Sequence, residues 1–456
     1  DPRDPSSIAE CLESVIASSS ALDRLAKRSQ ARIGAYGWTH VAEDSLEGYE
    51  RAILRRRPRR SRRARIALVT PWPPERSGVA DYNLRLAREL GEQVDVDIVT
   101  ARSAKQYAPP LERGVRIMGP EEYVALERLR QHDRVVYCMG NSLFHGHVYE
   151  LLRNRPGPVV FHDVQITGFY GWQAGLERPD HPSAALAAKI QSMYGARLPP
   201  DATRDGSLPW DRQLALGIYM TREIQSLAEE CFVHSKFAMD LLELDRGGLD
   251  RHVPLRLVPF GMPAASRASR ECSSSQGTLI VSMGVVNEVK GIAQLISAFA
   301  LVAGGRPDAR LVIAGPTDAV ESRRWREYAR EHAPQANIEI PGHVDGDRYT
   351  ALLREADLAV QLRLVTNGEA SAAIADCLAA GVPTLITDLG WASELPADAV
   401  SRVPLGIEAV ALAQQIDCLL SDPARLSAMR RAALDHAAAN SFARVADVYI
   451  HALELD

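Results

Sequence analysis

A lysine in the second half of the chain stands where a diphosphate-binding cation would be expected. Residues 284–291, with the sequence GVVNEVKG, follow an apolar run and carry Lys290 immediately before a glycine. A lysine held in a loop beside a glycine and a helix start meets a diphosphate as a point charge. The alternative is that Lys290 is an ordinary solvated side chain.

A second loop, in residues 361–376, combines an anion-binding helix start with two carboxylates. It carries Asn367, Gly368 and Glu369, and an alanine-rich helical pattern follows. Free N–H groups at a helix N-terminus attract anions, and the helix macrodipole strengthens that attraction. Glu369 and Asp376 are two turns apart, so both can face one side of the helix. Because carboxylates repel phosphates but accept hydrogen bonds from sugar hydroxyls, the pair favours a nucleotide sugar over a nucleoside triphosphate.

The first half of the chain offers two further candidates at the carboxyl ends of apolar runs. Gly78, in the sequence PPERSGVADY, follows the run 65–70, and a glycine there lets backbone N–H groups approach a phosphate. His162 and Asp163 follow the run 159–162, at the end of the strand where open α/β sheets place their ligands. The alternatives are a tight turn at Gly78 and a structural role for His162.

These candidates need two sheets to position them. Apolar runs predict strands at 65–70, 94–100, 134–138, 159–162 and 230–234, and a second series at 278–284, 310–314, 338–340, 358–362 and 383–387. Most intervening stretches have a helical period, and strands alternating with helices predict parallel sheets. The exceptions are a polar, proline-containing insertion at 178–211 and the Ser- and Ala-rich segment 264–276, which is the natural linker. The predicted fold class is α/β, with two doubly wound, Rossmann-like domains and a cleft between them.

The order of these motifs resembles that in the family 4 glycosyltransferases, a retaining group with the GT-B fold. PPERSGVADY resembles the N-terminal glycine loop of that family, and VPFGM at 258–262 resembles its VIPNG segment. GVVNEVKG resembles GRLVPEKG, DCLAAGVP resembles EAMACGTP, and LGWASE at 389–394 resembles the GGxPE turn. The resemblance implies an acceptor domain at 64–263, a donor domain at 277–438 and a final helix at 439–456 that returns to the N-terminal domain.

The resemblance also assigns roles to single residues. The predicted catalytic residues are His162, near the reacting sugar, and Glu369. The predicted donor-binding residues are Gly78, Lys290, Arg363, Gly368, Ala370, Ser371 and Asp376, of which Asp376 holds the ribose. The predicted acceptor-binding residues are Asp81, Tyr82 and Asn141.

Two positions depart from the family pattern. Val285 stands where the family has an arginine, so Lys290 is left to hold the diphosphate, with Arg363 as a substitute for the missing cation. The acidic pair is Glu-x6-Asp, whereas the family has Glu-x7-Glu, so the first glutamate of the family pattern falls on Gly368.

The activity that the resemblance implies is transfer of a sugar from a nucleoside diphosphate donor to an acceptor, with retention at the anomeric carbon. The nucleotide sugar is a substrate, and no cofactor is expected. No metal is expected either, because helix dipoles and cationic side chains neutralise the leaving diphosphate and no Asp-x-Asp stands at a strand end. Two alternatives stay open. One is a GT-B-fold nucleotide-sugar epimerase, and the other is a catalytically silent GT-B domain that serves as a scaffold in a tandem enzyme.

The two ends of the chain repeat each other. A constant shift of 404 positions places Ile8 on Leu412 and Trp38 on Phe442 without a gap. The alternative is chance, because two amphipathic hairpins can be slid into apolar register. The repeat predicts that residues 1–60, a helical extension and a linker, contain the tail of an upstream homologous domain. We expect helices at about 8–17, 21–33 and 39–54, with Trp38, Val41 and Leu46 buried.

Composition excludes several other classes of protein. The 456 residues carry a net charge of -5, which offers no global attraction to nucleic acid. No apolar run is long enough to span a bilayer, and six scattered cysteines predict reduced thiols in a cytoplasmic protein. Arg55–Arg65 holds eight arginines in eleven residues. The favoured interpretation is a solvated linker, and the alternative is docking to anionic lipid at the inner face of a membrane, or to a phosphate-bearing acceptor.

Overall fold

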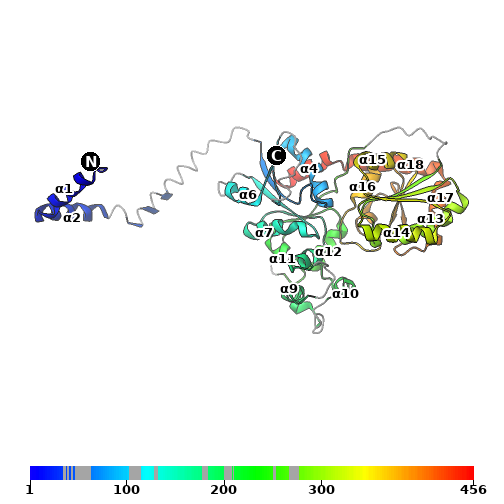
Figure 1. Ribbon diagram of the computed structural model, residues 1–456, viewed down its shortest axis with the longest axis horizontal. Helices are drawn as coiled ribbons and strands as arrows, with labels where there is room; N and C mark the ends of the chain where they lie inside the picture. The colour runs from blue at the N-terminus through cyan, green and yellow to red at the C-terminus, as the bar shows by residue number, and fades with distance from the viewer. Residues whose placement is uncertain are drawn as a thin grey trace. The chain divides into compact units, whose positions relative to one another are not determined.

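The chain forms two compact units, Asp1–Arg62 and Arg63–Asp456. The computed structural model describes residues 1–33, 37–38, 41–42, 45–46, 63–101, 114–127, 132–176, 183–199, 208, 210–249, 253–265 and 277–455. In the first unit, the described residues include two helices, α1 (Pro5–Ile16) and α2 (Ser19–Ile33) (Figure 1). The second unit contains both sheets, so the candidate site lies within it.

The first sheet of the second unit is parallel throughout and is wound in two directions from β1. Its order is β3-β2-β1-β4-β5-β6-β7. The strands are β1 (Arg65–Val69), β2 (Asp95–Val99), β3 (Val115–Met118), β4 (Arg134–Met139), β5 (Val159–Phe161), β6 (Cys231–Val233) and β7 (Leu255–Leu257). Four consecutive residues of β1 are buried, because helices cover both faces of the sheet.

The second sheet is also parallel and repeats this winding around β8. Its order is β10-β9-β8-β11-β12-β13. The strands are β8 (Leu279–Met283), β9 (Arg310–Ala314), β10 (Asn337–Gly342), β11 (Leu358–Gln361), β12 (Thr384–Thr387) and β13 (Val400–Val403). Two doubly wound sheets are the predicted architecture, which is therefore confirmed.

Helices cover both faces of each sheet. Around the first sheet they are α4 (Gly78–Gln93), α6 (Pro120–Glu127), α7 (Gly146–Asn154), α8 (Thr167–Gln173), α9 (Ala184–Tyr194), α10 (Trp210–Ala215), α11 (Arg222–Leu227) and α12 (Lys236–Arg246). Around the second they are α13 (Ile292–Gly305), α14 (Ala319–His332), α15 (Gly346–Glu355), α16 (Ala372–Ala379), α17 (Ala409–Leu420) and α18 (Pro423–Ala439). The last helix, α19 (Phe442–Ala452), packs against α4 (Figure 1). The C-terminal helix therefore returns to the first sheet, as the resemblance implied.

The ten predicted strands are all present within one or two residues of their expected bounds. Three strands, β3, β7 and β13, were not predicted; β3 and β7 are short, and each carries charge or exposed positions. The insertion at 178–211 was predicted to be non-helical, and that was wrong, because α9 occupies Ala184–Tyr194 and buries Leu186, Ile190 and Tyr194.

Some predictions for the first unit are confirmed and others are wrong. The first two helices are confirmed as α1 and α2. Trp38, Val41 and Leu46 are helical, but the prediction that they are buried is wrong: their exposed fractions are 89%, 40% and 61%. The rest of the predicted third helix, Arg55–Arg62 and residues 266–276 of the linker lie outside the described residues.

The described end of the arginine-rich segment serves the fold. Arg63 donates hydrogen bonds to the carbonyl oxygens of Gly91 at 2.7 Å and Gln93 at 3.2 Å, at the C-terminal end of α4. A cation there satisfies carbonyl groups that the helix leaves free. Arg65 pairs with Asp95 at 3.1 Å. No helix in the described part of the chain is both long and apolar enough to cross a membrane.

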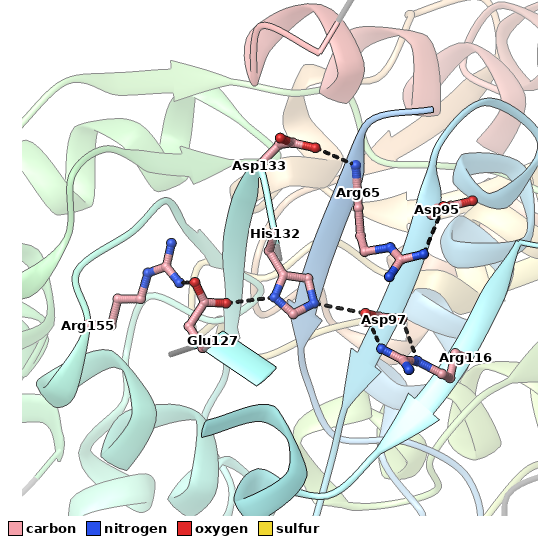
Figure 2. Close-up of polar contacts among 8 residues, drawn as sticks. All are labelled: Arg65, Asp95, Asp97, Arg116, Glu127, His132, Asp133 and Arg155. Atoms are coloured by element: carbon pink, nitrogen blue, oxygen red, sulfur yellow. Dashed lines mark hydrogen bonds and ion pairs between the residues drawn. The ribbon is translucent and has the colours of Figure 1, made fainter. Parts of the chain in front are cut away.

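An ionic network around the buried His132 links β2 and β3 of the first sheet to the end of α6 (Figure 2). The side chain of His132 lies between Asp97, at 2.8 Å from Nε2, and Glu127, at 2.6 Å from Nδ1. Burial alone would raise the pKa of Asp97, but hydrogen bonds from His132 and Arg116 outweigh it and lower the pKa to about 2. Arg155 pairs with Glu127 on the other side.

Candidate functional site

A large cavity lies at the carboxyl ends of the central strands of both sheets. The winding reverses between β1 and β4 in the first sheet, and between β8 and β11 in the second. The loops that follow these four strands, together with His162 and Asp163 after β5, line a cavity of about 800 Å³. Open α/β sheets bind ligands where the winding reverses, and this volume suits a small organic ligand.

Two helices begin at the wall of this cavity, one from each sheet. They are α4, which starts at Gly78, and α16, which starts at Ala372. Free N–H groups at helix N-termini carry partial positive charge, so two helix starts together make an anion site. A methyl group added at Gly78 would meet no atom within 4 Å. The glycine therefore leaves room in the cavity and is not required by the packing of the fold.

Lys290 stands at the same wall, at the end of a short 3-10 helix, Glu288–Lys290. The turn that follows needs glycine, because Gly291 has φ +60° and an added Cβ would lie 3.0 Å from Leu362. Burial and, to a smaller extent, the charge of Arg363 together lower the pKa of Lys290 to about 7. A phosphate placed beside Lys290 would favour the charged ammonium again.

Glu369 does not share a helix face with Asp376, so that prediction was wrong. The helix begins only at Ala372, because its N-cap, Ser371, has an extended backbone with φ -104° and ψ 109°. The Glu369 carboxylate instead accepts hydrogen bonds from Arg363, from Thr366 Oγ1 at 2.9 Å and from the backbone N–H of Asn367 at 2.6 Å. Glu369 therefore shapes the loop and partly neutralises Arg363 at the cavity wall.

Asp376 lines a second cavity of about 400 Å³, which shares Gly78 and Tyr82 with the first. Its carboxylate accepts hydrogen bonds from Arg85 at 2.9 Å and from the Tyr349 hydroxyl at 3.0 Å. Two carboxylate oxygens offer about four acceptor positions, so capacity for further hydroxyl groups is left.

Asp81 and Tyr82, predicted to bind the acceptor, lie with the predicted ribose residue. Asp81 lines the cavity of Asp376, and burial raises the pKa of Asp81, opposed by the charge of Arg85 and assisted by that of Asp376. The hydroxyl oxygen of Tyr82 accepts a hydrogen bond from the N–H of Gly261 at 3.0 Å. The structure thus places Asp81 in the cavity of Asp376, whereas His162 and Asn141 line the larger cavity.

His162 is a neutral imidazole in the wall of the larger cavity. Burial lowers its pKa well below the usual range, and the neighbouring His234 and His145 lower it further. Its Nε2 atom has no hydrogen-bond partner among the residues that the structure describes. Its ring meets the ring of Tyr82 edge-on at 5.1 Å. The ring is thus held in place by packing, while one nitrogen is left for a ligand.

The acidic neighbour of His162 is tied to the loop after β4. Asp163 accepts a hydrogen bond from the backbone N–H of Asn141 at 2.8 Å, and its burial raises its pKa. Asn141 in turn accepts through Oδ1 from the N–H of Phe169 at 2.9 Å. Asn141, predicted to bind the acceptor, lines the cavity, but its amide oxygen already accepts a hydrogen bond within the fold.

His145 is a site residue that the sequence analysis missed. It is 1% exposed and lines the larger cavity, and its Nδ1 lies 3.2 Å from the carbonyl oxygen of Ser142. The same Nδ1 lies 3.0 Å from the hydroxyl oxygen of Ser142, and Nε2 has no partner in the described part of the chain. Burial lowers the pKa of His145 to about 3. The spacing from Asn141 was visible in the sequence, but the 3-10 turn at 143–145 that aims the ring inward was not.

Gly368 lines neither cavity and instead joins the two halves of the site. Its φ is +82°, and an added Cβ would lie 2.9 Å from Val164. The carbonyl oxygen of its neighbour Asn367 accepts hydrogen bonds from the N–H groups of Val164 at 2.7 Å and Gln165 at 2.8 Å. The loop after β11 is thus docked by its backbone on the loop after β5.

Glu394 makes a second tie between the two sheets. Its carboxylate accepts hydrogen bonds from the backbone N–H groups of Lys236 at 3.0 Å and Phe237 at 2.6 Å, at the start of α12. A carboxylate at a helix N-terminus satisfies free donors and interacts favourably with the macrodipole. The turn that resembles GGxPE therefore holds the halves of the site together.

One protein-family profile matches part of the chain. Residues 269–436 match the sequence profile of the family described as Glycosyl transferases group 1. This segment contains Lys290, the loop after β11 and Asp376. No curated protein matches the chain by sequence.

Solved structures resemble most of the chain. Sucrose-phosphate synthase from Thermosynechococcus elongatus has a TM-score of 0.60 at 17% identity, covering 86% of this chain and 100% of its own. Anabaena Alr3699/HepE in complex with UDP has a TM-score of 0.57 at 13% identity, covering 86% and 99%. WaaG, a glycosyltransferase involved in lipopolysaccharide biosynthesis, has a TM-score of 0.55 at 14% identity, covering 85% and 99%. At these identities the likeness establishes the fold, which is GT-B.

Proposed function

We propose that this protein transfers a sugar from a nucleoside diphosphate donor to an acceptor, with retention of the anomeric configuration and without a metal. The observation that carries the proposal is the meeting of two helix N-termini and Lys290 at one cavity wall. Three sources of positive potential from two sheets suit a diphosphate better than a single phosphate. The neutral His162 stands in the same cavity, where the sugar would lie.

The family and the fold support the same conclusion. The group 1 glycosyltransferase profile covers the segment that carries Lys290 and Asp376. The Anabaena structures of the same fold hold UDP, and one of them holds UDP-glucose. We therefore place the diphosphate of the donor against α16 and Lys290, and its ribose in the smaller cavity beside Asp376.

The chemistry then follows from the charges of the site. As the bond between sugar and diphosphate breaks, negative charge grows on the diphosphate, and Lys290 with the two helix starts stabilises it. His162 forms a hydrogen bond with a sugar hydroxyl. Because its imidazole is neutral, it does not oppose the positive charge that develops on the sugar ring. The acceptor enters from the loop after β4, where one of its hydroxyls forms a hydrogen bond with Nε2 of His145, an atom without a partner among the described residues.

The test is to follow both products of the reaction with a panel of nucleotide sugars and candidate acceptors. A glycosyltransferase releases the nucleoside diphosphate and forms a glycoside whose anomeric configuration, read by NMR, matches that of the donor. An epimerase converts the donor without an acceptor and forms no glycoside. Formation of a glycoside with inverted configuration would contradict the retaining assignment.

A second candidate function is a catalytically silent GT-B domain. The specific observations are Val285 in place of a cation and the pairing of Arg363 with Glu369, which together leave less positive charge for the diphosphate. A silent domain would bind nucleotide sugars, or nothing, and would not hydrolyse them. Release of nucleoside diphosphate by the wild type that is lost in Lys290→Ala would exclude it.

A further inference from the structure

The helical hairpin α1–α2 repeats the helix boundaries and the turn of α17–α18 at a constant shift. The shift of 404 positions takes Pro5 to Ala409 and Ile16 to Leu420, which are the first and last residues of α1 and α17. The same shift takes Ser19, where α2 begins, to Pro423, where α18 begins. A chance alignment of two amphipathic sequences would not place both ends of the first helix, the turn and the start of the second helix at equivalent positions.

The hydrogen bonds of the turn between the helices also repeat at this shift. The N–H of Ala17 donates to Glu13 O at 2.9 Å, and the equivalent N–H of Ser421 donates to Asp417 O at 3.0 Å. Likewise, the side chain that caps the second helix accepts from the residue three positions later in both copies. The pairs are Ser18 Oγ with Ala21 N at 3.3 Å, and Asp422 Oδ1 with Arg425 N at 2.9 Å.

The match continues into the segment after the hairpin. The N–H of Val41 donates to Gly37 O at 3.0 Å, and the equivalent N–H of Val445 donates to Ser441 O at 2.9 Å. In the C-terminal copy this turn starts α19, the helix that packs on the first sheet. The described residues 5–33, 37–38 and 41–42 therefore carry features of the C-terminal hairpin and of the helix start that follows it.

Burial is what differs between the two copies. Leu412 and Ile416 are fully buried in the core that α17 shares with α13, whereas their counterparts Ile8 and Leu12 are 43% and 56% exposed. Phe442 is 7% exposed, and its counterpart Trp38 is 89% exposed. The first unit thus presents the same apolar stripe as the C-terminal hairpin, without the cover that the hairpin has there.

The contacts of the C-terminal hairpin show what kind of surface this apolar stripe packs against. Its α17 packs against α13, and Leu412 shares a core with Val403 of β13 and Phe299 of α13. The matching partner of α1–α2 is therefore an apolar helix and sheet edge of the same kind, as found in a GT-B donor domain. In the C-terminal copy, β13 ends only a few residues before α17. A donor domain that directly precedes the hairpin in the same polypeptide would place its last strand in the equivalent position.

We infer that α1–α2 is a docking surface for a second GT-B donor domain, encoded immediately before residue 1 of this sequence. The protein then holds two GT-B units in tandem, and α1–α2 is the C-terminal hairpin of the first. This inference is independent of the proposed activity, because it rests on the repeat and on the exposed stripe alone.

The first test is to read the coding sequence in frame before Asp1. The repeat predicts an apolar strand equivalent to β13 within about ten residues and a helix equivalent to α13 about 100 residues upstream. The second test compares hydrogen exchange of α1 in residues 1–456 and in the longer natural polypeptide. We expect α1 amides to exchange at least tenfold more slowly in the longer chain, because docking closes a helix that is otherwise free to open.

A matched pair of variants shows whether the apolar stripe causes the protection. Leu12→Glu places a charge in the stripe and should abolish it, while Ser14→Glu adds the same charge at a position whose counterpart, Cys418, is exposed, and should leave it intact. An upstream sequence without the strand and helix pattern would overturn the inference, as would equal exchange of α1 in both chains. Dimerisation of residues 1–456 that Leu12→Glu abolishes would also overturn it, since the stripe would then bind a second copy of this chain.

Discussion

The ammonium of Lys290 gives the proposed donor site a pH dependence that can be worked out in advance. The pKa of Lys290 is lowered to about 7, mainly by burial and then by the charge of Arg363. A bound diphosphate favours the charged form and returns the pKa toward its ordinary value of about 10.4. Donor binding therefore takes up a proton at pH values above 7.

The size of the effect follows from the two pKa values. Because only charged Lys290 binds the diphosphate fully, affinity is complete below pH 7 and is lost as the pH rises above it. The loss is about tenfold for each pH unit between 7 and 9, or about 1.4 kcal/mol per unit. Removal of the ammonium in Lys290→Met should cost about 3 kcal/mol or more at pH 6, because the slope alone amounts to about 1.4 kcal/mol for each of the two pH units. It should also abolish the slope.

The assay is titration calorimetry with an intact nucleotide sugar, whose diphosphate has no group that titrates near neutral pH. Repeating the titration at pH 8 in buffers of different ionisation enthalpy measures the proton uptake, expected to be about 0.9 per donor bound. Lys290→Arg is the matched control, because a guanidinium stays charged throughout this range and should bind without a slope. An affinity that is flat from pH 6 to 9 in the wild type, or a slope that persists in Lys290→Met, would refute the placement of the diphosphate.

Further substitutions test other parts of the account. His162→Ala should lower turnover by at least about 100-fold with nearly unchanged donor affinity in calorimetry; a parallel loss of thermal stability would indicate a structural role instead. Asp376→Ala should weaken binding of a nucleoside diphosphate but not of pyrophosphate, and equal losses would refute the ribose assignment. Gly78→Ala should leave the melting temperature unchanged while weakening the donor-induced thermal shift, because an added Cβ meets no protein atom within 4 Å and lies at the cavity wall. The folded pKa of Asp97, about 2, lies below its unfolded value, so its contribution is present above pH 4 and lost as the pH falls to 2. Urea denaturation should therefore show a loss of about 2 kcal/mol over that range, smaller in His132→Ala.

The strands that hold the site were predictable because they are buried on both faces. Such strands are continuous apolar runs, and β1, β8 and β9 are apolar over most of their length. By contrast, β7 has two exposed positions and β3 has one, so neither stands out from a loop in the sequence. The polar insertion concealed α9, because its alanine-rich helix buries only one side among polar neighbours.

The site was only partly predictable, because its details depend on loop conformation. Lys290 and Gly78 lie at helix starts, which glycine and strand ends mark in the sequence. Glu369 has the right residue type, but the extended backbone before α16 turns its carboxylate toward Arg363 and away from Asp376. The inward turn of His145 depends likewise on a 3-10 helix of three residues, for which spacing gives no signal.

The N-terminal repeat was predictable in its helices but not in its burial. Periodicity fixes which residues of α1 and α2 share a face, and the structure confirms both helices. Burial depends on a partner as well, and Trp38 is 89% exposed. The apolar side chains of the first unit therefore indicate which kind of surface they could contact. The sequence pattern alone could not show whether such a surface covers them.

The most direct test of glycosyl transfer at this site is the release of nucleoside diphosphate from a panel of nucleotide sugars, measured for the wild type and Lys290→Ala under identical conditions. The account predicts that at least one donor is consumed by the wild type, with its sugar transferred to water or to an added acceptor. It also predicts that Lys290→Ala reduces the rate at sub-saturating donor by about tenfold or more. Release that is equally fast in both proteins, or no release with any donor, would contradict it.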